Sequence, residues 1–231
     1  VSLPESAEVA NCGTICGAVD AEEIDEDRRQ ARYYAERGIK TEILDERALH
    51  AVEPNLREGL AGGLLVEGDS VVYQLFATGY LIDKAKAHGT EIRVGSRGFE
   101  ITDGGVRLAD GAFIAASKVV NAAGLAAADL SPGLQMAKRK GHLVITERSP
   151  NFARHQLVEL GYLKSAHGNA SDSVAFNVQP RATGQILLGS SRQLGVENSE
   201  IDHDILRRMT ARAFDYMPKL RQLPVTRVWT G

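Results

Sequence analysis

A stretch of small residues at positions 117–124 is the first place where residue types in this sequence point to chemistry. Two valines, Val119 and Val120, lead into Asn121-Ala122-Ala123-Gly124, which has almost no side-chain bulk. Gly and Ala at the end of a buried strand let another backbone or a bound ligand come close. Two interpretations follow from the residues alone: tight packing of a helix on a strand, or a strand end that faces a cofactor.

The two cysteines offer little metal chemistry. Cys12 and Cys16 stand in a C-x3-C pair, and no second Cys/His pair with ligand spacing accompanies them. We interpret both as thiols that bind no metal, which favours a reducing compartment and predicts a cytoplasmic protein. The sequence also contains no Ser/His/Asp set and no carboxylate pair that we would assign as catalytic.

An alternating strand at residues 173–180 supplies candidate binding residues. One face of this strand carries Val174, Phe176 and Val178. The other face carries Ala175, Asn177 and Gln179. The ordinary arrangement is one apolar core face and one solvated polar face, and the pattern leaves open which face meets a ligand. Arg181 follows in the turn PRATG, where the alternatives are a solvated arginine and a contact to a substrate.

Capping and stop signals predict four helices. Asp and Gly at helix ends satisfy backbone groups that the helix itself leaves unpaired, and Pro stops a helix. The helix at 72–82 has an apolar face of Val72, Leu75, Phe76, Gly79, Tyr80 and Ile82, closed by Gly89. The others are 20–38, ended by Gly38; 46–53, between Asp45 and Pro54; and 202–217, capped by Asp202 and ended by Pro218.

Period-two patterns predict the strands. Residues 90–116 contain four short alternating runs, TEIRV, GFEIT, GVRLA and AFIAA, with Asp103-Gly104 and Asp110-Gly111 as turns, which is typical of an antiparallel meander. KVVNAAG lacks alternation and predicts a strand buried on both faces. Further strands are expected at 40–44, 63–66, 141–146, 173–180, 185–191 and 224–231. The predicted fold class is α+β, with a mostly antiparallel sheet, flanking helices, a β-meander and one returning strand.

Composition excludes two classes of partner. The chain of 231 residues has 27 Lys and Arg against 30 Asp and Glu, a net charge of -3, and one basic cluster, Lys138-Arg139-Lys140. A nucleic-acid partner is therefore not expected. No apolar run approaches the roughly 18 residues that a membrane span needs, and the N-terminus lacks the basic and apolar pattern of a signal peptide.

Five motifs follow one another along the chain: ERALHAVEPNLREGLAGGLLVEGDSVVYQ, VVNAAGLAAADL, RKGHLVI, VQPRATGQILLGSSRQLG and VTRVWTG. In this order they resemble the FAD-dependent amino-acid and amine oxidoreductases of the glycine oxidase, sarcosine oxidase and D-amino-acid oxidase type. The resemblance extends from about Gly13 to Gly231. GHLVITERSP and AFNVQPRATGQILLGSSRQ bring it nearest to the opine oxidase and hydrogen cyanide synthase branch.

The resemblance implies a domain organisation. Residues 13–89 and 138–231 correspond to two parts of a substrate-binding domain, and 90–130 to the β-meander and returning strand of an FAD-binding domain. The family's G-x-G-x-x-G segment and its C-terminal flavin segment, with an Arg-Pro motif that binds substrate carboxylate, have no counterpart in the sequence. We therefore expect an internal part of a flavoenzyme, with FAD held by the full-length protein rather than by this chain alone.

The resemblance also implies roles for single residues. Ala122, Ala123 and Gly124 would lie beside the adenosine and pyrophosphate part of FAD. His142 stands where relatives often carry Gln near the flavin, and its alternative is a structural strand histidine. Tyr73 stands where relatives often have Pro beside the flavin, and its alternative is a packing residue. Together with Phe176 and Arg181, His142 is a candidate for substrate binding.

The implied activity is oxidation of a C–N bond in a small-molecule amino acid or secondary amine, with hydride transfer to the flavin giving an imine. Two alternatives remain from the sequence: a non-catalytic module or fragment that does not bind FAD, and a subunit whose FAD site is completed by another chain. Apolar surface left where the missing segments would dock predicts self-association of the isolated chain.

Overall fold

The computed structural model describes residues 3–4, 7–161 and 172–231. The chain divides into two compact units. Unit 1 comprises Val1–Tyr80 and Arg139–Gly231, and unit 2 comprises Leu81–Lys138. Each unit has its own β-sheet, and the two are described in turn.

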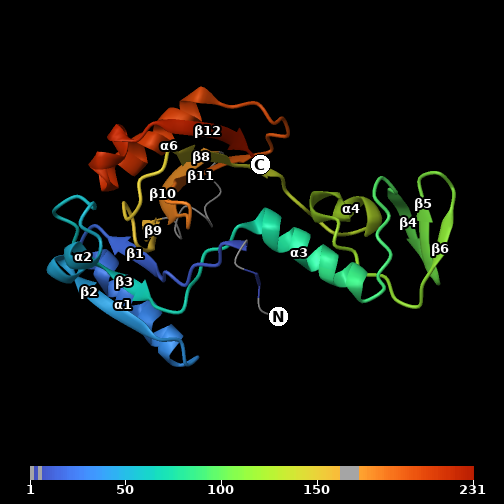
Figure 1. The fold of residues 1–231 in the computed structure, drawn as a ribbon, viewed down its shortest axis with the longest axis horizontal. Helices are drawn as coiled ribbons and strands as arrows, with labels where there is room; N and C mark the ends of the chain where they lie inside the picture. Colours follow the sequence, from blue (N-terminus) through green and yellow to red (C-terminus); the bar gives the residue numbers. More distant parts are fainter. Residues whose placement is uncertain (1–2, 5–6, 162–171) are drawn as a thin grey trace. The chain divides into compact units, whose positions relative to one another are not determined.

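A sheet of nine strands, counted within the described residues, forms the centre of unit 1 (Figure 1). The strands are β1 (Thr14–Ala18), β2 (Thr41–Asp45), β3 (Gly62–Val66), β7 (Arg139–Lys140), β8 (His142–Thr146), β9 (Gln156–Glu159), β10 (Asp172–Pro180), β11 (Ile186–Leu194) and β12 (Val225–Thr230). Their order in space is β12-β8-β11-β10-β9-β1-β3-β2, with β7 beside β11. Only β1 and β9 pair in parallel among these strands, so the predicted α+β class with a mostly antiparallel sheet is confirmed.

The predicted helices form, and side-chain caps begin three of them. The helices are α1 (Ala21–Ala35), α2 (Glu46–Val52), α3 (Gln74–Ala87) and α6 (His203–Tyr216), followed by the short 3-10 helix η3 (Pro218–Gln222). Asp45 accepts a hydrogen bond from the backbone N–H of Ala48 at 2.8 Å. Asp202 accepts a hydrogen bond from the backbone N–H of Ile205 at 3.1 Å. Both caps were predicted, because an Asp oxygen satisfies one of the free N–H groups of the first turn.

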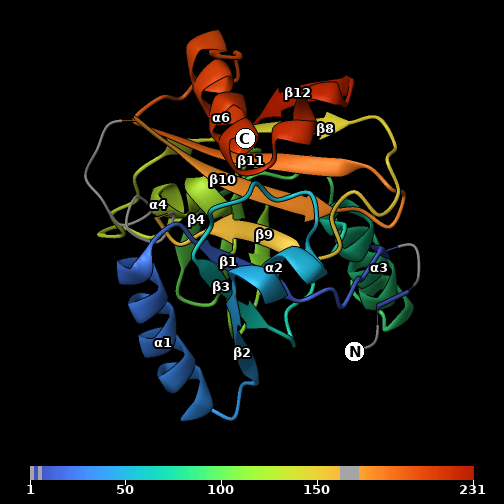
Figure 2. The same cartoon turned by 90° about the vertical axis from the view of Figure 1, so that its left-hand side faces the viewer.

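Helix α6 covers one face of the sheet at β10 and β11 (Figure 2). Its buried residues are Ile205, Met209, Ala213 and Tyr216, and Met209 and Ala213 are almost completely shielded from solvent. The ring of Tyr216 stacks on Phe176 of β10 with centroids 4.5 Å apart and planes 5° apart. Stacked aromatic pairs add about 1 kcal/mol beyond the area that they bury, so this contact fixes the helix on the strand.

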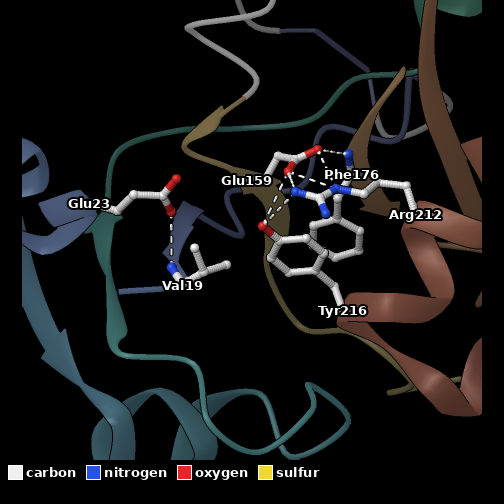
Figure 3. Close-up of polar contacts among 6 residues, drawn as sticks. All are labelled: Val19, Glu23, Glu159, Phe176, Arg212 and Tyr216. Carbon is white, nitrogen blue, oxygen red and sulfur yellow. Dashed lines mark hydrogen bonds and ion pairs between the residues drawn. The ribbon is translucent and has the colours of Figure 1, made fainter. Parts of the chain in front are cut away.

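A buried carboxylate at the end of β9 joins this strand to β10 and α6 (Figure 3). Glu159, at the end of β9, has a side chain that is 4% exposed. Its Oε1 accepts the backbone N–H of Phe176 at 2.6 Å, and its Oε2 accepts the hydroxyl of Tyr216 at 3.2 Å. Arg212 of α6 forms an ion pair with the same carboxylate. A buried charge is tolerated only when paired and hydrogen-bonded, and Glu159 has both kinds of partner.

Unit 2 contains the predicted meander. Strands β4 (Gly98–Thr102), β5 (Gly105–Leu108) and β6 (Phe113–Ala115) pair antiparallel in this order. The turn glycines Gly104 and Gly111 have φ of 92° and 89°, the left-handed region that the Asp-Gly signal predicts. The predicted first strand, residues 90–94, is wrong: the segment is irregular, and Val94 at its end is 92% exposed.

The prediction of a buried strand for KVVNAAG, residues 118–124, is also wrong. A strand needs a neighbour for its backbone groups, and this segment pairs with none of the described strands; Val120 is 87% exposed. Instead, the side-chain amide of Asn121 donates to the Ala127 carbonyl at 2.9 Å and to Ser131 Oγ at 2.7 Å. These bonds hold a turn that leads into the short helices η2 (Gly124–Ala126) and α4 (Ala127–Leu130).

Helix α3 was predicted correctly as a helix, but its apolar face is not buried. Leu75 is 72% and Phe76 53% exposed, and Ala77 is the buried residue of this helix among those described. Strands β1 and β9 were not predicted. Both are short, and their sequences TICGA and QLVE carry neither strict alternation nor a flanking turn signal.

Two ionisable side chains, the buried Asp27 and the half-buried Cys16, lie on α1 and β1. Asp27 of α1 is fully buried, and neither of its carboxylate oxygens has a hydrogen-bond partner among the described residues. Burial, with the nearby charges of Glu23 and Glu26, raises the pKa of Asp27 to about 7. Burial, with the charges of Asp27 and Asp69, likewise raises the pKa of Cys16 to about 12, so this thiol is neutral near pH 7.

The raised pKa of Asp27 predicts how stability varies with pH. Between its ordinary pKa of 3.8 and about 7, the folded state holds a proton that the unfolded state releases, so stability falls as pH rises through this window. Asp27→Asn removes the charge. We expect it to raise the free energy of unfolding on the order of 3 kcal/mol at pH 8 and to change it little at pH 4.

Urea unfolding at both pH values measures this difference. Asp25→Asn is the matched control, because Asp25 lies on the same helix and is exposed, with Arg28 as its partner. A gain for Asp27→Asn that is equal at pH 4 and pH 8 would contradict the assignment of the raised pKa.

Candidate functional site

A cleft of about 540 Å³ opens on the sheet of unit 1. Its lining combines apolar side chains with a few polar ones, the composition that is typical of small-molecule sites. Two arginines are the charged members, and the described residues of the lining include no Asp or Glu. The lining residues are Tyr73, Gln74, Leu75, Leu143, Ile145, Gln179, Arg181, Leu187, Arg227 and Trp229.

The cleft lies on the face of the sheet opposite α6. In β8, Val144 borders a shallow hollow that it shares with Leu206 and Thr210 of α6. Successive side chains of a strand point to opposite faces, so Leu143 and Ile145, which line the cleft, point away from the helix. The sheet therefore separates a packed face from a face that is open to a ligand.

The floor of the cleft is one row of side chains across four strands. The register pairs Arg227 of β12 with Ile145 of β8, and Ile145 with Leu187 of β11. Leu187 is paired in turn with Gln179 of β10. Neighbouring strands are about 4.8 Å apart, so the two polar ends of this row are roughly 14 Å apart. Between them lie two aliphatic side chains that can bind a hydrocarbon group and exclude water.

Arg181 stands at one end of the cleft with its charge already neutralised. Its guanidinium donates to Glu8 Oε2 at 2.9 Å and lies over the ring of Tyr73, 4.8 Å from the centroid. Its side chain is 7% exposed. These contacts fix Tyr73, which precedes α3, against the sheet, so both sequence candidates belong to the cleft wall.

Arg227 stands at the other end and has no carboxylate partner among the described residues. Its guanidinium lies over the ring of Trp229, 5.7 Å from the centroid. The two residues are i and i+2 on β12, so they share the face that borders the cleft. Stacking on an indole holds an arginine in place without neutralising its charge.

The structure places His142 and Phe176 on the α6 side of the sheet. Phe176 is buried against Tyr216. His142 is buried as well, and both of its ring nitrogens are occupied: Nδ1 lies 2.9 Å from Ser191 Oγ, and Nε2 accepts the backbone N–H of Asp202 at 3.0 Å. An accepting Nε2 puts the ring proton on Nδ1, and burial followed by the charge of Lys140 lowers the pKa of His142.

Residues 122–124 belong to unit 2. Ala122, Ala123 and Gly124 are exposed, and Gly124 has a φ of 57° with no atom within 4 Å of the position that a Cβ would take. The backbone of this turn is therefore accessible, which is what the second interpretation of the small residues requires.

Among the residues that line the cleft, sequence reasoning named Tyr73 and Arg181 as candidates and missed the others, which include Arg227 and Trp229. Arg227 and Trp229 were used only as part of a family motif, although the alternation of VTRVWTG already places them on one strand face. Gln179 was assigned to a strand face but not to a site. The cysteines do not contribute, and no group of three or more potential metal ligands occurs among the described residues.

Comparison with known proteins now identifies the class of protein. The family model described as FAD dependent oxidoreductase matches residues 3–231. The chain therefore belongs to this family of flavin-dependent enzymes, as the order of its motifs indicated. A search of curated proteins finds no match.

Solved structures agree with this fold. Glycine oxidase from Geobacillus kaustophilus superposes with a TM-score of 0.83 at 22% identity, covering 97% of this chain and 59% of that one. L-proline dehydrogenase from P. horikoshii superposes with a TM-score of 0.83 at 19% identity, covering 98% of this chain and 61% of that one. L-alpha-glycerophosphate oxidase from Mycoplasma pneumoniae, with FAD bound, superposes with a TM-score of 0.72 at 18% identity, covering 95% of this chain and 60% of that one. The chain thus spans about three fifths of each of these proteins.

Among the described residues, no helix is both long enough and apolar enough to cross a bilayer.

The two cleft arginines are expected to contribute to stability by different amounts, because only Arg181 has a carboxylate partner among the described residues. Arg181→Met leaves the half-buried Glu8 without its partner, and we expect a loss of about 2 kcal/mol in the free energy of unfolding. Arg227→Met removes only a stacking contact and should cost less than about 1 kcal/mol. Urea unfolding followed by circular dichroism measures both, because Trp229 fluorescence would itself respond to the substitutions. Equal losses would show that Glu8 does not depend on Arg181.

Proposed function

We propose that this chain is the substrate-domain portion of an FAD-dependent oxidoreductase that oxidises the C–N bond of an amino acid or secondary amine to an imine. The cleft on the open face of the sheet carries this proposal. Its aliphatic floor between polar ends suits a small molecule with a hydrocarbon part and ionic groups. Glycine oxidase and L-proline dehydrogenase are among the structures that share the fold, which favours an amine substrate.

The residues of unit 2 fit the cofactor that the family uses. The turn at Ala122, Ala123 and Gly124 is exposed and has open space around it, so a large ligand could lie directly against the backbone. We propose that these three residues would hold the adenosine and pyrophosphate side of FAD. When bound, FAD supplies the two-electron acceptor that takes up a hydride from the carbon beside the substrate nitrogen.

The chain's own contribution is to bind, orient and shield the substrate. Ile145 and Leu187 exclude water from the centre of the cleft, which strengthens the polar contacts around it. The described lining contains no carboxylate or imidazole, so no side chain there is placed to take a proton near neutral pH. We infer that the amine reaches the cleft in its neutral form after losing its proton to solvent.

The test begins with the coding DNA on both sides of the chain. The gene product with any in-frame flanking segments is then purified and titrated with FAD, and the 231-residue chain is titrated in parallel. Glycine, sarcosine and L-proline are added without oxygen, and we expect at least one to abolish the visible absorbance of the flavin. Absence of FAD binding in both proteins would favour the alternative, a non-catalytic module.

A bulky residue in the turn of unit 2 should impair FAD binding. Ala123→Leu adds volume where the cofactor is proposed to touch the backbone, and we expect FAD affinity in the flavin-binding gene product to fall by about tenfold or more. Flavin fluorescence titration measures it. The control is Ala112→Leu, at an exposed turn of the same unit, which should leave the affinity unchanged. Equal affinities in the two variants would remove residues 122–124 from the cofactor site.

A further inference from the structure

We propose that Arg227 binds a carboxylate of the ligand that occupies the cleft, and that it selects ligands with an aliphatic group next to that carboxylate. This inference rests on the proposed function for the identity of the ligand as a substrate. The contact between the Arg227 guanidinium and a carboxylate is inferred from the residues of the cleft alone.

The position of Arg227 is set by backbone pairing rather than by a flexible loop. It lies within β12, opposite Ile145, and continues the row whose next members are Ile145 and Leu187. A ligand whose anionic group reaches Arg227 therefore places its neighbouring carbons over these two aliphatic side chains. A site built on strands holds its geometry more closely than one built on loops.

The charge of Arg227 is the unbalanced one in the cleft. Arg181 has Glu8 as its partner at 2.9 Å, whereas the contact given for Arg227 is the ring of Trp229. With no Asp or Glu in the described lining, the cleft carries a surplus positive charge at the β12 end. A planar guanidinium offers paired N–H donors that match the two oxygens of a carboxylate.

The contact with Trp229 leaves the guanidinium ready to bind. The ring lies 5.7 Å from the guanidinium carbon, and none of the guanidinium N–H donors of Arg227 has an acceptor among the described residues, so they are available to a carboxylate. The ring also restricts the side chain to fewer rotamers, so less conformational entropy is lost when a ligand binds.

The test uses the single tryptophan of the chain as the reporter, because Trp229 lines the cleft and touches Arg227. The 231-residue chain is titrated with isovalerate and, separately, with isovaleramide, which has the same shape without the charge. We expect saturable changes in Trp229 fluorescence, with isovalerate bound about tenfold more tightly than the amide.

Variants separate the contact from general charge effects. Arg227→Gln should lower the affinity for isovalerate by about tenfold and leave that for isovaleramide unchanged. Arg227→Lys keeps the charge without the paired donors and should give an intermediate loss. The control is Arg221→Gln, since Arg221 also lies over an aromatic ring, that of Phe214, but does not line the cleft. Ligand-observed NMR confirms each affinity independently of the altered tryptophan environment, and circular dichroism shows that each variant is folded.

Three results would overturn the proposal: no saturable binding of isovalerate, equal binding of acid and amide, or equal isovalerate affinities in the parent chain and Arg227→Gln. Each is independent of FAD. If the gene product reduces its flavin with an amine while Arg227→Gln still binds isovalerate normally, the carboxylate contact is wrong and the proposed function stands. If isovalerate binding depends on Arg227 but FAD is not bound, the anion site stands without the oxidoreductase.

Discussion

The buried carboxylate of Glu159 is the interaction on which the architecture of unit 1 depends. It accepts hydrogen bonds from β10 and α6 while its own strand, β9, pairs with β10 on one side and with β1 on the other. β9 is thus the junction between the antiparallel strands β12-β8-β11-β10 and the strands β1-β3-β2. A four-residue strand has few ladder bonds to hold such a junction. The ion pair with Arg212 and the backbone N–H of Phe176 compensate, because a buried charge stripped of either partner would destabilise the fold strongly.

The two faces of the same strands then take separate roles. On the α6 side, Phe176 and Val178 are packed to near-complete burial, and polar groups such as His142 have their hydrogen bonds satisfied inside the protein. On the cleft side, Arg227 has no such partner among the described residues, and Ile145 and Leu187 border open space. Stability therefore resides on one face and capacity for binding on the other. Except at Arg181, which is paired with Glu8, this allows substitutions in the cleft to alter the ligand with little cost in folding.

Capping and turn signals were read correctly from the sequence, whereas features that depend on distant partners were not. The caps Asp45 and Asp202 and the turn glycine Gly104 act within a few residues, so their outcome depends little on the rest of the chain. The strand expected at 118–124 depends on partners distant in sequence. Burial of Glu159 depends on three elements meeting, which no short window can reveal. The alternation in β10 was correct, but whether the Phe176 face or the Gln179 face met the cleft depended on which side α6 covers.

The small residues of the 117–124 segment acquire a different meaning in the structure from the one expected of a buried strand. Asn121 uses its side chain to hold the turn through Ala127 and Ser131, so the conformation of Ala122–Gly124 does not require packing against a neighbour. A strand end closed by packing would have left no room for a ligand. A turn held by its own asparagine leaves the backbone exposed and its shape defined at the same time. Those are the two properties that close approach to a cofactor demands, and they are why we propose a cofactor contact here rather than tight helix–strand packing.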